Sequence, residues 1–138
     1  MSGGEPRGEL ELDRLIASLE PRLDPEPYAF RVERDPAGAA PPGSAIAAVR
    51  EEEGWTWIVQ AATPGAGSWA RIVLTVHSDL EAVGLLAAVA GRLAAAAIPV
   101  NAMAGWYHDH LFVPWERREA ALSALGDLQR EAAARRSG

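Results

Sequence analysis

The chain has 138 residues, a hydrophobic fraction of 49% and a formal net charge of -6 at pH 7. This length fits one ordinary domain, or two very small units that share a core, and is too short for a catalytic domain beside a regulatory one. The acidic balance lacks the concentrated basic face that a nucleic-acid partner requires. The absence of cysteine excludes disulfides, thiolate nucleophiles and cysteine-based metal sites, and fits a reducing compartment.

The N-terminal residues show no targeting segment. Residues 1–8 are rich in glycine and polar side chains, and we expect them to be disordered. They contain no apolar run of the kind a signal peptide needs, and the most apolar stretch, residues 82–100, is interrupted by Gly84, Arg92 and Pro99. The sequence therefore predicts a cytoplasmic protein that is not exported and does not span a membrane.

The N-terminal half, residues 9–60, opens with a helical pattern. Apolar residues recur at helical spacing and predict an amphipathic helix over about residues 9–20. The prolines at 21, 25 and 27 end this pattern. The next segment has the alternation of a half-buried strand, with Tyr28, Phe30 and Val32 on one face.

Two loops divide the rest of this half. The run DPAGAAPPGS, residues 35–44, has the composition of a loop. A short apolar segment at 45–49, which could also form a helical turn, and the run WTWIV at 55–59 predict two further strands with a turn at Glu53-Gly54. Residues 61–68 are again rich in Pro, Gly and Ala, and we place the boundary between two subdomains there.

The second half has a clearer pattern. Arg71–His77 is rich in β-branched residues and predicts a strand. Ser78 and Glu81 have the spacing of a capping box, which predicts a helix that begins at Asp79. Apolar residues at spacings of three and four predict its buried face: Val83, Leu86, Ala90, Leu93 and Ala97.

The remaining residues predict two strands and a helix. The strands cover residues 98–104 and 108–113 and are joined by a turn at Gly105-Trp106-Tyr107; Pro114 then precedes a helix from about Trp115. Strand, helix, two strands and helix form the split pattern of a ferredoxin-like α+β fold that lacks its last strand. The N-terminal half is expected to supply the missing strand and a second sheet.

Two groups of sequence segments resemble those of a known protein family. The stretch HSDLEAVGLLAAVAGRLAAAAIPVNAMAGWYHDHLFVPWERREAAL, residues 77–122, resembles the ACT domain of small bacterial proteins, which have runs such as LAxAxIxVN and YYHDHxFVPW. LEPRLDPEPYAF and VREEEGWTWIV resemble the degenerate ACT-like unit that precedes it in those proteins. The resemblance covers about residues 10–130. It implies a ferredoxin-like βαββαβ fold with two ACT-like subdomains, at 9–60 and 70–134.

The resemblance also implies a function and a site. The chain is similar to the ACT modules of aspartokinase regulatory regions and of CASTOR-type arginine sensors, which bind small molecules between two ACT units. It therefore implies a non-enzymatic sensor of an amino acid, without a cofactor and expected to form a homodimer. The ligand-binding residues it implies are His77, Ser78, Asp79 and Glu81 on one side, and Gly105, Trp106 and Asp109 on the other.

Fold geometry gives a separate reason to examine this corner. In a ferredoxin-like sheet the first and third strands are antiparallel neighbours, so His77 and Ser78 should lie near Asp109. A helix N-terminus at Asp79 would offer its amides to a carboxylate, and Asp109 would face an ammonium group. The bland alternatives are that Ser78 and Glu81 only cap the helix, that Gly105 supplies a positive φ, and that Trp106 lies at a subdomain interface.

Other functions have weaker support in the sequence. His77, His108 and His110 would suggest zinc, but Asp109 points to the opposite strand face and no fourth ligand is evident, so no metal site is predicted. No catalytic triad, nucleophile elbow or phosphate-binding glycine loop is present, and no catalytic residue is assigned. The competing hypotheses are a structural dimerisation module without a ligand and, less favoured, a histidine-based metal enzyme.

Overall fold

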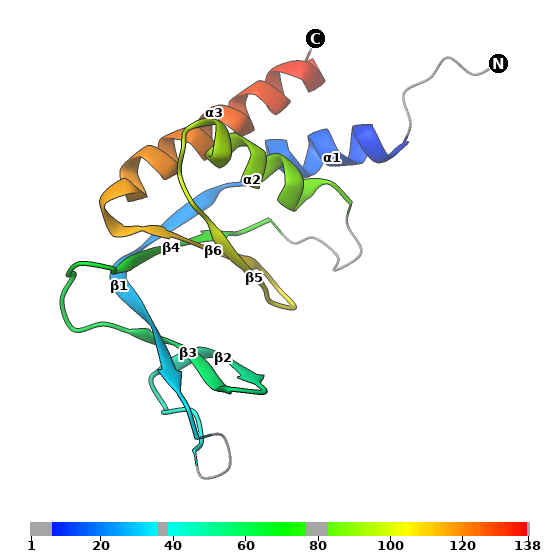
Figure 1. The fold of residues 1–138 in the computed structure, drawn as a ribbon. Helices are drawn as coiled ribbons and strands as arrows, with labels where there is room; N and C mark the ends of the chain where they lie inside the picture. Colours follow the sequence, from blue (N-terminus) through cyan, green and yellow to red (C-terminus); the bar gives the residue numbers. More distant parts are fainter. Residues whose placement is uncertain (1–6, 36–38, 77–82, 138) are drawn as a thin grey trace.

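The computed structural model describes residues 7–35, 39–76 and 83–137. Within them three α-helices lie on one side of a sheet (Figure 1). They are α1 (Arg7–Ala17), α2 (Leu85–Ala95) and α3 (Arg118–Ser137), with the short 3-10 helix η1 (Trp115–Arg117) before α3. The strands are β1 (Pro21–Glu33), β2 (Ala45–Glu51), β3 (Gly54–Gln60), β4 (Trp69–Leu74), β5 (Asn101–Ala104) and β6 (Asp109–Pro114).

All six strands form one antiparallel sheet in the order β2-β3-β1-β4-β6-β5. The expected pairing of the strand after residue 70 with the strand near 108–113 is confirmed, because β4 and β6 are antiparallel neighbours. The mixed helical and antiparallel architecture confirms the α+β, ferredoxin-like class. None of the helices in the described part of the chain is long and apolar enough to cross a bilayer.

The main core lies between the helices and the middle of the sheet. Successive strand residues point to opposite faces, so β4 directs Ala70, Ile72 and Leu74 toward the helices, and β6 directs Leu111 and Val113 the same way. The helices and their connections complete this core with Ile16, Leu19, Leu85, Val89, Leu93, Ile98, Ala121, Leu125, Leu128 and Ala132. The apolar contact of α3 with both other helices therefore holds the helical layer together.

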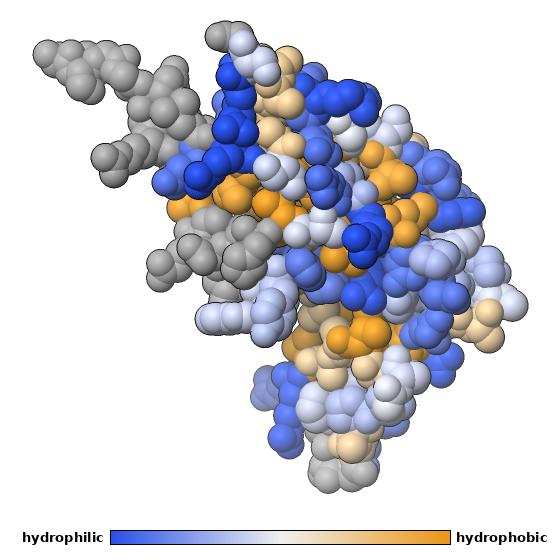
Figure 2. Space-filling view, turned by 180° about the vertical axis from the view of Figure 1, so that it is seen from behind, coloured by the Kyte–Doolittle hydropathy of each residue, from blue (hydrophilic) through white to orange (hydrophobic). Residues whose placement is uncertain are grey.

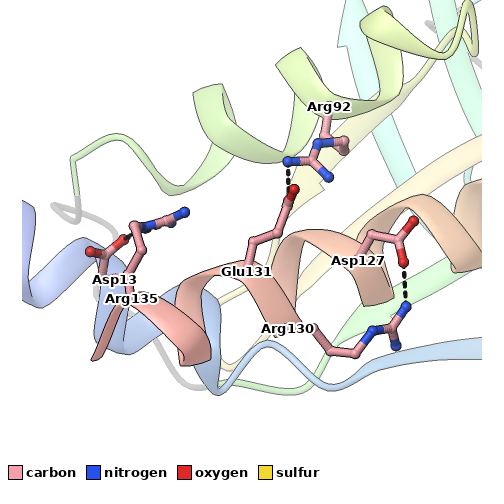
Figure 3. Close-up of polar contacts among 6 residues, drawn as sticks. All are labelled: Asp13, Arg92, Asp127, Arg130, Glu131 and Arg135. Carbon is pink, nitrogen blue, oxygen red and sulfur yellow. Dashed lines mark hydrogen bonds and ion pairs between the residues drawn. The ribbon is translucent and has the colours of Figure 1, made fainter. Parts of the chain in front are cut away.

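Ion pairs border this helical layer (Figure 3). Arg135 Nη2 on α3 donates to Asp13 Oδ1 on α1 at 2.9 Å, and Arg92 on α2 pairs with Glu131 on α3. The hydrogen bond from Arg135 lowers the pKa of Asp13 below its ordinary value. Because one side chain of each pair is exposed and the other is partly exposed, the pairs contribute little stability beside the apolar core.

Strand β1 is longer than the sequence predicts. It begins at Pro21, whereas the sequence predicts a helix as far as residue 20 and a strand only from residue 28. Its pairing with β4 changes register between Leu23 and Pro27, so Pro25 lies in a β-bulge. Proline is tolerated at the first residue of a strand and at bulges, where the missing N–H costs no ladder bond. Helix α1 ends at Ala17, before the first of these prolines, and the prolines do not exclude a strand.

The N-terminal half also differs from the expected order. Helix α1 is followed by three strands in succession, and the described residues between β1 and β2 form no helix. Strand β1 supplies the strand missing beside β4, as expected, but β2 and β3 extend the same sheet instead of building a second one. Helix α1 begins at Arg7, so Arg7 and Gly8 are helical and not part of the expected disordered segment.

Helix α2 begins six residues later than predicted. Gly84 precedes it with a left-handed φ of 93°, and the first helical residue is Leu85. This interruption changes the buried face: Leu85, Val89 and Leu93 are buried, while Val83 is 87% exposed. The predicted capping box at Ser78 and Glu81 lies outside the described residues, as does Asp79. The prediction that the long helix itself starts at Asp79 is wrong.

The surface carries exposed apolar side chains in two regions. Phe30, Val32, Ile46 and Val49 lie on the N-terminal strands, and Val83, Leu86, Trp106 and Tyr107 lie near the start of α2 and in the β5–β6 turn. Seen from behind, hydrophobic patches are separated by hydrophilic side chains (Figure 2).

Candidate functional site

The predicted site surrounds the point where β4 ends and β6 begins. Leu74 pairs with Asp109 in the β4–β6 ladder, and Asp109 also pairs with Ala104 of β5. The chain that leaves β4 toward α2 therefore starts beside Asp109, as the fold argument predicts. Of the seven predicted ligand-binding residues, the structure describes Gly105, Trp106 and Asp109. The other four, His77, Ser78, Asp79 and Glu81, lie outside the described residues.

Gly105 opens the tight turn between β5 and β6. Its N–H donates to the His108 carbonyl oxygen at 2.9 Å. A Cβ atom at this position would lie 2.9 Å from the same oxygen and 3.3 Å from His110 Nε2. The described glycines with positive φ are Gly54, Gly67 and Gly84, so Gly105 does not serve the positive-φ role considered from the sequence. Close approach of the backbone to this turn explains the glycine.

The two aromatic residues of the turn point into solvent. Trp106 is 71% exposed and Tyr107 is 69% exposed. Neither side chain is therefore a pocket wall formed by the described residues, nor part of an interface between the two halves of the chain. Large exposed aromatic side chains are common at binding surfaces, so both are available to a ligand or a partner.

His108 and Asp109 are the polar groups of this corner. The Nδ1 atom of His108 is buried and has no hydrogen-bond partner among the described residues. An unpaired buried polar atom costs about 1 to 3 kcal/mol, which makes this nitrogen a candidate for contact with a bound group. Asp109 lies opposite Leu74 and therefore points toward the helical layer. His110, one residue later, points to the opposite face, as the sequence predicts.

The opposite face of the sheet holds a polar network of Asp24, Tyr28, Arg71 and His110, which we call the Arg71 network. Arg71 Nε and Nη2 lie 3.2 and 3.1 Å from His110 Nδ1, and Arg71 Nη1 donates to the Tyr28 hydroxyl at 3.2 Å. The Tyr28 hydroxyl donates to Asp24 Oδ2 at 2.5 Å. The sequence reasoning missed this network because it used only the β-branched residues of β4. The alternation of Arg71 with Ala70 and Ile72 is the signal that was available.

The environment shifts two pKa values in this network. Burial lowers the pKa of His110 below its ordinary value, and the neighbouring Arg71 guanidinium lowers it further. Burial and the hydrogen bond to Asp24 raise the pKa of Tyr28. His110 is therefore neutral at pH 7. Because its Nδ1 atom accepts from Arg71, the ring proton resides on Nε2.

An aromatic cluster of Tyr28, Phe30, Trp69 and Phe112 lies on the same face as the Arg71 network. The ring centroids of Tyr28 and Phe112 are 5.9 Å apart, and those of Phe30 lie 5.5 Å from Trp69 and 5.8 Å from Phe112. Tyr28, Ile58 and Phe112 are buried and form a second, smaller core. Rings on β1 and β6, which are separated by β4, therefore meet over this face.

Two other features of the chain bear on metal or ligand binding. Within the described ranges, no three His, Cys, Asp or Glu side chains are close enough to hold a metal ion; His77 is outside these ranges. A surface hollow of ≈ 380 Å³ lies on α1 and α3 instead of at the β4–β6 corner. It is lined by Glu11, Asp13, Arg14, Arg135 and Arg136.

Comparison with known proteins places this architecture in a family. Two models of the ACT domain match the chain, one over residues 7–65 and the other over residues 69–127. The chain belongs to the ACT domain family. The first ACT range ends in the linker after β3, and the second contains β4, α2, β5, β6 and the first half of α3. Strand β1 pairs with a strand from each range.

Solved structures support the same fold. A Vibrio cholerae protein of unknown function, described as a possible transport protein, is 36% identical with a TM-score of 0.70, and the match covers 86% of this ACT chain and 95% of that protein. A protein from Agrobacterium tumefaciens shares the fold at 14% identity, with a TM-score of 0.63 over 79% of this chain and 87% of its own. No curated protein shows significant similarity to this chain.

Proposed function

We propose that this tandem ACT protein is a non-enzymatic regulatory module that binds an amino acid at the β4–β6 corner. Family membership supports the general role, because ACT domains are typically regulatory ligand-binding modules. The proposed ligand-binding residues are His77, Ser78, Asp79 and Glu81 after β4, and Gly105, Trp106 and Asp109 on the β5–β6 side.

One observation supports the choice of this corner as the binding site. Asp109 is placed by its pairing with Leu74 at the exit of β4. Its carboxylate points toward the helical layer, where the first backbone amides of α2 offer donors, so these groups suit a ligand with one positive and one negative end. The ammonium and carboxylate groups of an amino acid meet this requirement.

Because α2 starts later than expected, we propose different backbone amides as the groups that bind the ligand carboxylate. The first turn of α2 begins at Leu85, and Gly84 provides no side-chain cap for it. Asp109 points toward the same layer that contains α2. The backbone amides of this helix start therefore replace those at Asp79 as the proposed partners of the carboxylate within the described chain.

A thermal-shift measurement with the twenty amino acids tests this function. We expect at least one amino acid to raise the melting temperature, since a ligand at about one hundred times its Kd adds about 2.7 kcal/mol to stability. Asp109→Asn should abolish this rise, because a charge-assisted hydrogen bond contributes about 1.5 to 3 kcal/mol. Trp106→Phe should weaken any fluorescence change caused by the same ligand.

Asp127→Asn on the exposed side of α3 is the matched control, since it makes the same chemical change away from the corner. It should leave the ligand response intact. An unchanged response in Asp109→Asn, with both variants folded, would refute the proposed site. Absence of a response to every amino acid in the parent protein would refute the proposed ligand class.

A structural dimerisation module is the second candidate function. Strand β2 is an edge of the sheet, and its apolar run from Ala45 to Val49 carries no charge. An edge of this composition is suited to pairing with another strand. Light scattering after size-exclusion chromatography should show a dimer for the parent and a monomer for Ile46→Lys, which places a charge at an exposed position of the edge strand. A monomeric parent would exclude this function.

A further inference from the structure

Among the described residues, Arg71 forms a long ion pair with Asp24 and no direct hydrogen bond to a carboxylate. Its nearest acidic atom is Asp24 Oδ2, at 3.5 Å from Nη1. Both oxygens of Asp24 already accept other bonds, since Oδ1 receives the N–H of Glu26 at 2.9 Å and Oδ2 receives the Tyr28 hydroxyl at 2.5 Å. Through these hydrogen bonds Asp24 stabilises the β1 bulge and the position of Tyr28. By contrast, Arg135 lies 2.9 Å from its carboxylate partner.

The remaining donors of Arg71 form a pair. A guanidinium has five N–H groups in a fixed planar arrangement. Nε and one N–H of Nη2 are directed to His110 Nδ1, and one N–H of Nη1 is directed to Tyr28. No hydrogen bond within the described part of the chain uses the second N–H of either terminal nitrogen. A carboxylate can bind N–H groups of both terminal nitrogens with its two oxygens.

Aromatic and apolar side chains surround this charge. Arg71 lies directly opposite Phe112 in the β4–β6 ladder and shares the strand face of Trp69. Its guanidinium lies 5.7 Å from the centroid of the Tyr28 ring. Met103 packs beside the buried pair of Tyr28 and Phe112. A ligand that places a carboxylate on Arg71 would therefore lay its body against rings and a thioether.

Part of this face is open to solvent around Arg71 and Phe30. The described helices cover the opposite face of the sheet (Figure 1). The side chain of Arg71 is 21% exposed, that of Asp24 is 19% exposed, and Phe30 at the edge of the aromatic cluster is also exposed. A half-buried cation in an aromatic setting is weakly hydrated, which strengthens its attraction for an anion.

We propose that the Arg71 network and the adjacent aromatic cluster bind a carboxylate carried on a flat aromatic body. This second ligand site lies on the sheet face opposite Asp109 and is independent of the amino-acid site. Arg71 binds the carboxylate through its two remaining N–H groups. His110 and Tyr28 hold the guanidinium in place, and the rings of Phe30 and Trp69 contact the aromatic body.

Isothermal titration with benzoate tests this site, and benzamide serves as the uncharged ligand of similar shape. Benzoate should bind the parent protein at least about tenfold more tightly than benzamide, because only the anion pairs with the guanidinium. It should quench tryptophan fluorescence through Trp69. It should also raise the pKa of His110 measured by NMR, since a neighbouring anion favours the charged imidazole.

Variants at position 71 distinguish the effect of the positive charge on benzoate binding from the effect of the paired N–H donors. Arg71→Lys keeps the charge but loses the paired donors, and should weaken benzoate binding by about tenfold. Arg71→Gln should remove the preference for benzoate over benzamide. Arg22→Gln is the matched control: Arg22 is exposed, and it pairs with Val73 on the same sheet face. It should bind benzoate as the parent does.

The proposal fails if the parent does not prefer benzoate over benzamide, or if folded Arg71→Lys binds benzoate as tightly as the parent. The Lys variant decides the matter if Arg71→Gln does not fold. Asp109→Asn should keep the benzoate affinity of the parent. Benzoate binding and the amino-acid response can therefore fail separately, which distinguishes the two sites.

Discussion

The region under the helices and the N-terminal hairpin of β2 and β3 differ in how they are stabilised. Strands β4 and β6 contribute to the main core under three helices, whereas no residue of β2 or β3 belongs to that core. The hairpin joins the molecule through β1 and through the small core of Tyr28, Ile58 and Phe112. It also carries exposed apolar residues at 46 and 49. The comparison indicates that global stability resides in the helix-covered region, and that the hairpin opens more easily.

The largest expected effect is in the main core. Leu125→Ala removes a fully buried side chain of α3 and should lower the free energy of unfolding by about 2 to 5 kcal/mol. Leu86→Ala makes the same change at an exposed position of α2 and should shift it by less than about 0.5 kcal/mol. Urea denaturation measures both. Similar losses for the two variants would contradict the assignment of stability to this core.

An intermediate effect is expected at the turn of the hairpin. Gly54 has a φ of 146°, and a Cβ atom there would lie 2.1 Å from the Glu33 carbonyl oxygen of β1. Gly54→Ala should cost about 1 to 3 kcal/mol of backbone strain. Hydrogen exchange should accelerate in β2 and β3 before β4 and β6. Gly65→Ala, in open space, is the control. Equal acceleration in all strands would show that the hairpin does not open separately.

The smallest effect is a pH dependence of stability that arises from the Arg71 network. The pKa of His110 lies below its ordinary value of 6.5 in the folded protein. The unfolded chain therefore binds more protons as the pH falls through 6.5, and the folded protein loses stability from there down to the folded pKa. His110→Gln should flatten this part of the stability curve. An identical slope in the parent and the variant would show that another group titrates.

The sequence predicted the pairing of β4 with β6 because the regular split pattern allows few topologies. It failed for β1, because prolines at a strand start and a bulge look the same as prolines that end a helix. It failed for α2, because helical spacing does not reveal the left-handed backbone of Gly84. In each case a local backbone feature overrode a residue pattern.

The candidate site was predictable only in part. Strand register follows from the fold, so the position of Asp109 beside the end of β4 could be inferred. The unpartnered Nδ1 atom of His108 depends on how surrounding atoms exclude water, which no spacing encodes. The Arg71 network joins residues 24, 28, 71 and 110. Because these residues are far apart in the sequence, no local motif indicates that their side chains meet.

The bulged strand β1 joins the two ACT ranges in a single sheet. Its first residues pair with β4 and its last residues pair with β3. Cutting the chain in the 61–68 linker and separating the pieces would leave β4 with an unpaired edge in one fragment and β1 with an unpaired edge in the other. Each fragment would then expose a template for strand addition, and the fragments should associate with themselves or with each other. The ladder between β1 and β4 therefore keeps the two ACT ranges in one sheet and each of them free of an exposed edge at this junction.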